Sequence, residues 1–350
     1  MFNIGEGIIS QRINIAQVTF SVFETVRKVE RKDIFLEADF QRNFKWKNEK
    51  KSKLIESIIL DIPIQAIYLS EESDGKYEII DGQQRVRTIY EFVNNKFSMN
   101  KTKFFGEKRY FKDLDISVQR KIEDFQLVVF IVKKDNNPEV KFEIFERINT
   151  GAVKLNSQEL RNCIYRNKGI PFIKELVKEK EFIRLIKNTN VNINSMQDQE
   201  LALRFMSFYL KGIDSYTGNL KRFLNNTLDE YDIYREREEE IKYAFKNAAR
   251  NVYDVFGDEA FVISTKKKVG KRKINIALFD LHMITLSKYS NCVVNNCKEE
   301  IIRNFNKIIN NNDEFRSCIL GASNNNKIKT KKRFNIWNEC IKYILEENND

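Results

Sequence analysis

Apolar residues in the first half of the chain recur with two different spacings, which alternate along the sequence. Spacings of three and four residues predict helices, whereas short apolar runs bounded by turn residues predict strands. We expect helices at 48–60, 86–93, 117–124, 137–148 and 156–164, and strands at 64–69, 76–80 and 127–132. The last strand holds six apolar residues in succession, which predicts burial on both faces. The alternation favours an α/β domain at about residues 15–168.

The second half of the chain shows helical periodicity almost throughout. Helical segments are expected at 172–186, 197–210, 220–231, 238–256, 274–289, 298–310 and 334–345. We interpret residues 169–350 as an all-helical domain, which places the whole chain in the α+β class. Two basic segments, 266–273 and 327–333, interrupt the helices, and we expect both to be loops.

The charge balance points to a polyanionic partner. The 350 residues include 61 Lys and Arg against 50 Asp and Glu, a formal net charge of +11. Such an excess favours DNA, RNA or another anionic surface. An equally weighted alternative is that the sequence is simply rich in Lys and Asn throughout, because the charge is spread along the chain.

The two basic segments are candidate contacts to a DNA backbone, although a solvated loop is the commoner use of such a run. The candidate DNA-binding residues are Lys267, Lys268, Lys271 and Arg272 in the first segment, and Lys331, Lys332 and Arg333 in the second.

Several features favour a cytoplasmic protein. No apolar run approaches the roughly 20 residues that a membrane-spanning helix needs, and the N-terminus lacks the pattern of a signal peptide. The five cysteines are odd in number and scattered, as suits a reducing compartment. We therefore expect no membrane partner.

The single histidine, His282, argues against several hydrolytic mechanisms. A histidine-dependent nuclease, a zinc hydrolase and a Ser-His-Asp triad each need more histidines or a better-placed one. Because His282 lies in an apolar run, we interpret it as a core or interface histidine with satisfied hydrogen bonds.

The segment from Ile79 to Arg85 carries the strongest local indication of chemistry. It predicts a strand, a turn and the start of a helix. One interpretation is purely structural, with Asp81 as the helix N-cap and Gln84 completing a capping box. The other is an anion site, because Gly82 permits close approach of a ligand and the first helical turn presents free N–H groups. In that interpretation, Arg85 contacts phosphate oxygens directly. The sequence has no phosphate-binding loop of the G-x-x-x-x-G-K-[ST] type.

Two further polar clusters lie among aromatic residues. Gln41 and Arg42 stand between Phe residues before the first predicted helix. Arg147 and Asn149 stand at the end of the helix predicted at 137–148, where Arg147 is also suited to a plain capping role.

Together these segments closely resemble the DGQQR-motif family, which supplies the N-terminal domain of GmrSD-type modification-dependent restriction enzymes. The segments that carry the resemblance are Phe40-Gln41-Arg42, Trp46, Leu54-Ile55-Glu56-Ser57-Ile58, Ile62-Pro63, Ile80-Asp81-Gly82-Gln83-Gln84-Arg85, Phe145-Glu146-Arg147-Ile148-Asn149-Thr150-Gly151 and Gln158-Glu159-Leu160-Arg161. They span roughly residues 15–168. The chain also looks like the sensor half of phosphorothioate-dependent phage-defence proteins.

The resemblance implies a ParB/sulfiredoxin-like fold in which the strand–turn–helix binds nucleotide phosphates. Members of the family hydrolyse nucleoside triphosphates to control DNA cleavage. Carried onto this chain, the implied catalytic residues are Asp81, Gln84 and Arg85, and the implied nucleotide-binding residues are Gln41, Arg42, Gly82, Gln83, Arg87, Arg147 and Asn149. The implied cofactor is a nucleoside triphosphate with Mg²⁺. Asp81 or Glu146 would hold the metal or position water, but neither is assigned as a ligand.

This chain departs from many relatives, which continue into a nuclease domain with a histidine-centred metal motif. The resemblance therefore implies a separately encoded nuclease, or another output. Two alternatives stay open. One is a non-enzymatic DNA-binding or adaptor protein. The other is a Mg²⁺-dependent DNA nickase, which ranks last because no paired-carboxylate motif has convincing spacing.

Overall fold

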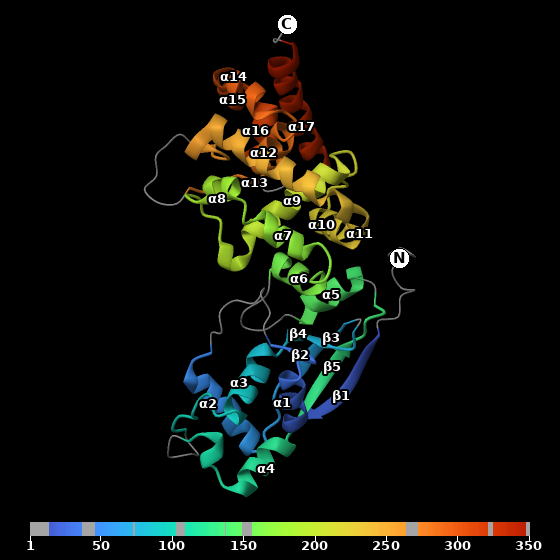
Figure 1. Ribbon diagram of the computed structural model, residues 1–350, viewed down its shortest axis with the longest axis vertical. Coiled ribbons are helices and arrows are strands. Elements are labelled where there is room, and N and C mark those ends of the chain that lie inside the picture. Colours follow the sequence, from blue (N-terminus) through green and yellow to red (C-terminus); the bar gives the residue numbers. More distant parts are fainter. Residues whose placement is uncertain are drawn as a thin grey trace, which may run out of the picture. The chain divides into compact units, whose positions relative to one another are not determined.

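The chain folds as two compact units, Met1–Ile164 and Tyr165–Asp350, called here the N-terminal unit and the helical unit. The computed structural model describes residues 14–36, 46–72, 74–102, 109–136, 138–148, 156–263, 272–320 and 325–347. The N-terminal unit combines a sheet with helices, and the helical unit is built from helices (Figure 1). The expected α+β class is therefore confirmed. The boundary expected between 168 and 169 lies in the same turn as the observed division.

A five-stranded sheet organises the N-terminal unit, with the strand order β1-β5-β3-β4-β2. The strands are β1 (Ile15–Ser21), β2 (Ile34–Phe35), β3 (Ile67–Glu71), β4 (Tyr77–Asp81) and β5 (Gln126–Val132). β5 pairs antiparallel with β1 and parallel with β3, whereas β4 pairs antiparallel with β3 and parallel with β2. The pattern of apolar residues had predicted the three inner strands but neither β1 nor β2, which form the two edges of the sheet.

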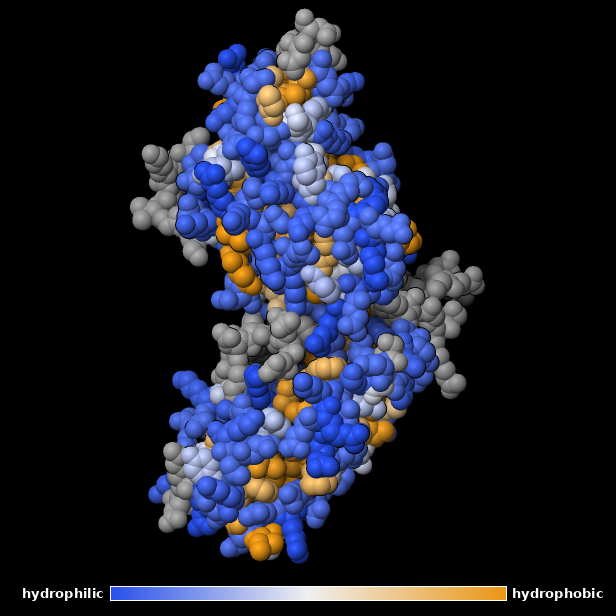
Figure 2. Space-filling view, viewed as in Figure 1, coloured by the Kyte–Doolittle hydropathy of each residue, from blue (hydrophilic) through white to orange (hydrophobic). Residues whose placement is uncertain are grey.

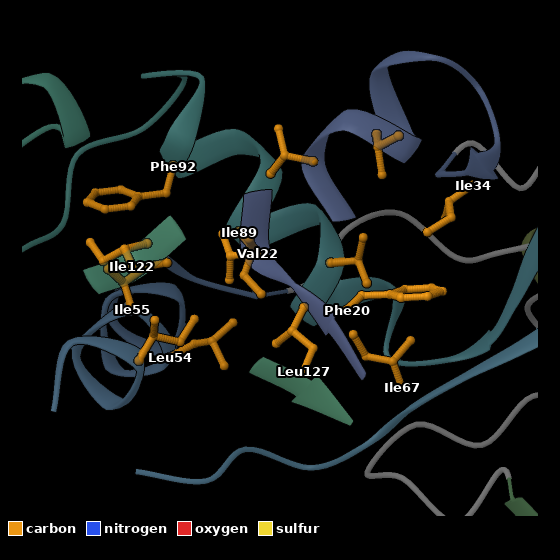
Figure 3. Packing of buried hydrophobic residues seen from close by; sticks show 14 of the residues in the cluster. Phe20, Val22, Ile34, Leu54, Ile55, Ile67, Ile89, Phe92, Ile122 and Leu127 are labelled. Atoms are coloured by element: carbon orange, nitrogen blue, oxygen red, sulfur yellow. The ribbon is translucent and has the colours of Figure 1, made fainter. Parts of the chain in front are cut away.

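Helices cover one face of this sheet and enclose the core of the unit (Figures 1 and 3). The helices of the unit are α1 (Val22–Glu30), α2 (Asn48–Ile59), α3 (Gln83–Val93), α4 (Ile116–Asp124), α5 (Pro138–Ile148) and α6 (Ser157–Ile164), with a 3-10 turn η1 (Phe111–Asp113). Helices α1 to α4 each contribute fully buried residues, such as Val22, Ile55, Ile89 and Ile122. These residues meet the alternate apolar residues of the strands, such as Leu127 (Figure 3).

The expectation that β5 is buried on both faces is wrong. Leu127, Val129 and Ile131 are buried against the helices, but Val128 between them is 37 % exposed. On that second face, the Phe130 ring stacks on the ring of Tyr68 from β3, with 5.1 Å between centroids. One face of β5 is exposed because its neighbour β1 is antiparallel. Strands are buried on both faces mainly in parallel sheets, where the helices that connect the strands cover both faces.

The helical unit departs from the sequence expectation in two ways: the helices Asn291–Asn296 and Asp313–Leu320 were not expected, and several expected helices begin or end elsewhere. Its helices are α7 (Ile170–Leu176), α8 (Lys180–Ile186), α9 (Gln197–Lys211), α10 (Leu220–Asp229), α11 (Tyr231–Tyr234), α12 (Glu238–Phe256), α13 (Ile276–Leu286), α14 (Asn291–Asn296), α15 (Lys298–Asn311), α16 (Asp313–Leu320) and α17 (Lys327–Lys342). Short 3-10 turns η2 (Ile193–Ser195), η3 (Arg235–Arg237) and η4 (Gly257–Glu259) join some of them, and a π turn, η5 (Tyr343–Glu347), follows α17. The single helix expected at 172–186 is two helices, α7 and α8.

The visible surface of both units is mostly hydrophilic (Figure 2). Within the described ranges, each helix is too short or too polar to cross a membrane. The most apolar helix, α13, is buried from Ala277 to Leu286 inside the helical unit. Its apolar character therefore reflects burial among other helices.

His282 on α13 lies in an aromatic core, as the sequence predicted, but its ring is not satisfied by hydrogen bonds. Its ring stacks on Phe256 at 4.4 Å between centroids and meets Phe305 edge-on at 4.9 Å. Neither ring nitrogen has a hydrogen-bond partner within the described part of the chain. The expectation of a satisfied histidine is therefore wrong, because the neighbouring rings offer no acceptor. Burial lowers the pKa of His282 to about 3.

His282 should make the stability of the protein depend on pH. Its folded pKa of about 3 lies below the ordinary value of 6.5, so the unfolded chain binds the proton more readily. Its contribution is intact above pH 6.5 and is lost as the pH falls toward 3. Between pH 8 and pH 5 this group should cost about 2 kcal/mol.

Unfolding of the wild type and of His282→Leu by urea at both pH values measures this effect. The wild type should lose about 2 kcal/mol more than the variant on acidification. Equal losses in the two proteins would contradict a neutral, buried His282.

Candidate functional site

The start of α3 is the centre of the candidate site, because β4 leads directly into it. β4 ends at Asp81, Gly82 is the N-cap with φ 100°, and α3 begins at Gln83. The predicted strand–turn–helix is confirmed, but the capping-box interpretation is wrong, because the cap is Gly82. Glycine has no side chain, and no side chain in the described residues caps this helix start. The N–H groups of the first turn therefore have no side-chain acceptor, and the positive end of the helix dipole faces outward from them.

Glycine is required at position 82 for two independent reasons. A φ of 100° is strained for any residue with a Cβ atom. A Cβ atom there would also lie 3.1 Å from Cγ1 of Ile67 and 3.2 Å from Nη2 of Arg85. This turn therefore packs closely against β3, and a Cβ atom at position 82 would require these side chains to shift by a few tenths of an ångström.

Arg85 is directed into the protein. Its Nη1 donates to Oε1 of Gln65 at 3.0 Å, and its Nη2 donates to the Ala66 carbonyl at 3.0 Å and to Oδ2 of Asp81 at 2.8 Å. These bonds join the end of β4 and the start of α3 to the segment before β3. Both terminal nitrogens therefore bind protein oxygens, and the observed role of Arg85 is to position Asp81. The Asp81 side chain remains 32 % exposed.

Three polar atoms in the first turn of α3 are buried without a hydrogen bond. They are Oε1 of Gln83, Oε1 of Gln84 and Nε of Arg85, and none has a partner among the residues that the structure describes. A buried polar atom without a partner costs about 1–3 kcal/mol, so such atoms are rare. Their concentration in three successive residues makes the start of α3 a candidate ligand site.

Positive charge lies one turn further along α3. Arg87 Nε is 3.7 Å from Oε1 of Glu91, and Nζ of Lys51 on α2 is 2.8 Å from Oε2 of the same carboxylate. Glu91 lies about two turns past Gly82, near the end of α3, and Nζ of Lys51 also lies 4.9 Å from the Phe97 ring centroid beyond that end. Of these two cations, Arg87 is therefore the nearer to the helix start.

The remaining predicted nucleotide-binding residues are not tested by these contacts. Gln41, Arg42 and Asn149 lie outside the described residues. Arg147 lies near the end of α5, where its Nε donates to Oε1 of Glu143 at 2.9 Å and its side chain is 78 % exposed. Its convergence on the start of α3 stays a prediction.

A Mg²⁺ ligand role for Asp81 or Glu146 also stays a prediction. Within the described ranges, no three His, Cys, Asp or Glu side chains gather as a metal site requires. Mg²⁺ beside a nucleotide needs only one or two carboxylates together with the phosphates. The exposed carboxylate of Asp81 fits that smaller requirement.

Sequence reasoning missed the partners that fix this site. Gln65 supplies the acceptor for Arg85, and the Leu36 carbonyl accepts from Nε2 of Gln83. Neither belongs to a local motif with the residue that it contacts, because 47 residues separate Gln83 from Leu36 and 20 separate Arg85 from Gln65.

The first basic segment is described only at its end. Lys267, Lys268 and Lys271 lie outside the described residues. Arg272 is described, and its Nη2 is 3.0 Å from Oδ1 of Asp258. A carboxylate thus already holds this candidate DNA contact.

The second basic segment is not a loop, which corrects the sequence expectation. Residues 327–333 form the first turns of α17, because Oδ1 of Asn326 accepts from the Ile328 and Lys329 N–H groups and caps the helix. Lys331 pairs with Asp214 at 2.8 Å, and Lys332 pairs with Glu314.

Arg333, the last of the candidate DNA contacts, belongs to the interior. It is 1 % exposed, and its Nη2 is 3.6 Å from Oδ2 of Asp280. The same carboxylate accepts from Nε of Arg204 at 2.8 Å. Arg333 therefore has no access to a phosphate backbone in this structure.

Comparison with known proteins identifies the N-terminal unit. Residues 22–166 match the family described as the N-terminal domain of GmrSD restriction endonuclease. The resemblance predicted from the motifs is thereby confirmed. The GmrSD domain begins at α1 and includes β4, Gly82 and α3 with the candidate site. No curated protein matches the chain.

The close packing at Gly82 predicts an unequal effect of two similar substitutions. Gly82→Ala and Gly75→Ala both place a side chain at positive φ, which costs about 1–2 kcal/mol. Only Gly82 would also meet neighbouring atoms, since a Cβ atom at Gly75 meets nothing within 4 Å. Overpacking should add about 1–3 kcal/mol at Gly82.

Scanning calorimetry of the two variants makes the comparison. The unfolding midpoint should fall further for Gly82→Ala than for Gly75→Ala. Equal decreases would show that the turn before α3 has more room than the distances indicate.

Proposed function

We propose that this chain binds a nucleoside triphosphate at the start of α3 and hydrolyses it within a DNA-directed restriction or defence system. One observation carries the proposal. The uncapped start of α3 combines a left-handed Gly82 with three buried polar atoms that lack partners in the described residues. The match of residues 22–166 to the N-terminal domain of GmrSD restriction endonuclease supports this setting.

The phosphates bind to main-chain N–H groups in this proposal. A helix start without a side-chain cap offers several N–H donors that point at one place, and the helix dipole favours negative charge there. Gly82 lets the ligand approach the backbone closely, since no Cβ atom stands in the way. Arg87, one turn further along α3, adds positive charge near the helix start.

Asp81 is the residue best placed for the hydrolytic step. Phosphoryl transfer to water depends mainly on positioning and on stabilising negative charge. Arg85 holds one oxygen of Asp81 at 2.8 Å, so the partly exposed carboxylate has a fixed orientation. It is suited to orient the attacking water or to serve as the carboxylate ligand of Mg²⁺, which neutralises phosphate charge when bound. Gln84 contributes an amide in the same turn.

We assign DNA binding or cleavage to the restriction or defence system as a whole, and not to particular residues of this chain. The net charge of +11 supports contact with a polyanion. Four candidate DNA contacts in the two basic segments, however, lie in ion pairs or in the interior: Arg272, Lys331, Lys332 and Arg333. The only histidine is buried in an aromatic core. We therefore propose that a histidine-dependent nuclease, where DNA is cut, lies outside these 350 residues.

Gln84→Leu should separate ligand binding from stability. The Oε1 atom of Gln84 has no partner within the described residues, so its removal costs the folded protein no known hydrogen bond. The melting temperature without ligand should stay the same or rise. The affinity for the best-bound nucleoside triphosphate should fall about tenfold or more, with a matching loss of phosphate release.

Gln119→Leu is the matched control on α4. Nε2 of Gln119 donates to the Leu114 carbonyl at 2.7 Å, so the variant should lose about 1 kcal/mol of stability but keep its nucleotide affinity. Thermal shift and calorimetric titration with ATP, GTP, CTP and UTP, with and without Mg²⁺, measure both quantities. Normal binding and turnover by Gln84→Leu would remove this residue from the site. Binding without phosphate release would favour a non-enzymatic switch.

A further inference from the structure

The side-chain amide of Gln83 has a fixed orientation at the start of α3. Gln83 is 9 % exposed, and its Nε2 donates to the main-chain carbonyl of Leu36, directly after β2. Because a carbonyl can only accept, the nitrogen of the amide must be the atom on that side. The oxygen Oε1 therefore lies on the opposite side of the amide group. It is buried, and nothing in the described residues donates to it.

This oxygen needs something that a phosphate group cannot supply. The first-turn N–H groups and Nε of Arg85 are donors, and phosphate oxygens would satisfy them. An ionised phosphate has only acceptors, so it cannot donate to Oε1 of Gln83. A ligand that satisfies the whole helix start must carry both an anionic group and an N–H or O–H group.

We infer that Gln83 accepts a hydrogen bond from an N–H or O–H group on the nucleoside part of the ligand. Gln83 then determines specificity, because it separates a nucleoside triphosphate from a bare polyphosphate chain. The donor is a sugar hydroxyl or a base N–H group, which share the same chemistry. This inference rests on the proposed nucleotide site at the start of α3.

The test compares ligands with and without a nucleoside. Calorimetric titration of the full chain with ATP, GTP, CTP, UTP and inorganic tripolyphosphate gives one affinity for each. The wild type should bind the best nucleotide about tenfold or more tightly than tripolyphosphate. Gln83→Met should lose most of that preference by weakening the nucleotide and leaving tripolyphosphate nearly unchanged. Gln119→Met, the control, should keep the preference.

Further arms identify the donor. The 2′-deoxy and 3′-deoxy forms of the best nucleotide test the sugar hydroxyls, and the ranking of the four bases tests the base. Each titration is repeated without Mg²⁺. The preference should persist there, because Gln83 contacts the nucleoside and not a metal-bound water.

Several results would overturn the inference. Equal wild-type affinities for the best nucleotide and for tripolyphosphate would do so, and would leave the proposed phosphate site intact. If the nucleotide is preferred over tripolyphosphate only in the presence of Mg²⁺, the donor to Gln83 is a metal-bound water and not the nucleoside. Equal weakening of both ligands by Gln83→Met would give Gln83 a merely structural role. If the wild type binds none of these ligands, both the inference and the proposed function fail.

Discussion

The candidate site depends on one buried guanidinium, that of Arg85. Its bonds to Asp81, Gln65 and the Ala66 carbonyl join the end of β4, the first turn of α3 and the segment before β3. A buried charge is stable only where it is paired and hydrogen-bonded, so these bonds constrain all three segments at once. The constraint also fixes what Arg85 can do, because a guanidinium whose terminal nitrogens bind protein oxygens contributes mainly geometry. The donors that remain for an anion are the backbone N–H groups of the first turn of α3 and Nε of Arg85.

A site built on backbone N–H groups makes particular demands on its surroundings. Gly82 must adopt a left-handed conformation so that the strand can turn directly into the helix. The polar side chains beside it must also hold their positions without a ligand. Gln83 does so through the Leu36 carbonyl, and Asp81 does so through Arg85. This arrangement leaves a few buried polar atoms without hydrogen bonds in the described residues. The donors and acceptors among them determine which ligand groups could bind.

The helical unit shows the same rule for buried charge with a different outcome. Asp280 accepts hydrogen bonds from Arg204 and faces Arg333, and all three residues are almost completely buried. Lys331 and Lys332, which neighbour Arg333 in sequence, lie nearer the surface in pairs with acidic residues. Consecutive basic residues thus have different surroundings. Because successive side chains of a helix point in different directions around its axis, some lie at the surface and one lies in the interior.

Much of the secondary structure could be predicted from interactions between residues close together in the sequence. The strand–turn–helix at β4 and α3, the helical second half and the α+β class all follow from periodicity and turn residues, which act over a few positions. The helix expected at 156–164 begins with a capping box, in which Asn156 Oδ1 accepts from the Glu159 N–H and Oε2 of Glu159 accepts from the Asn156 N–H. Family motifs along the first half indicated the GmrSD domain before any contact was known.

Only the tertiary structure decided how distant residues meet. It gave β5 one buried face, because β1 pairs beside it and helices α1 to α4 pack on one side. It placed Arg333 inside, left the nitrogens of His282 without hydrogen bonds in the described part of the chain, and bound Arg85 to Gln65. The spacing of apolar residues indicates which residues tend to be buried. It does not indicate which distant residues will contact each other in the interior. The sequence therefore determined the elements and the motif, and the packing of those elements decided which polar atoms were left for a ligand.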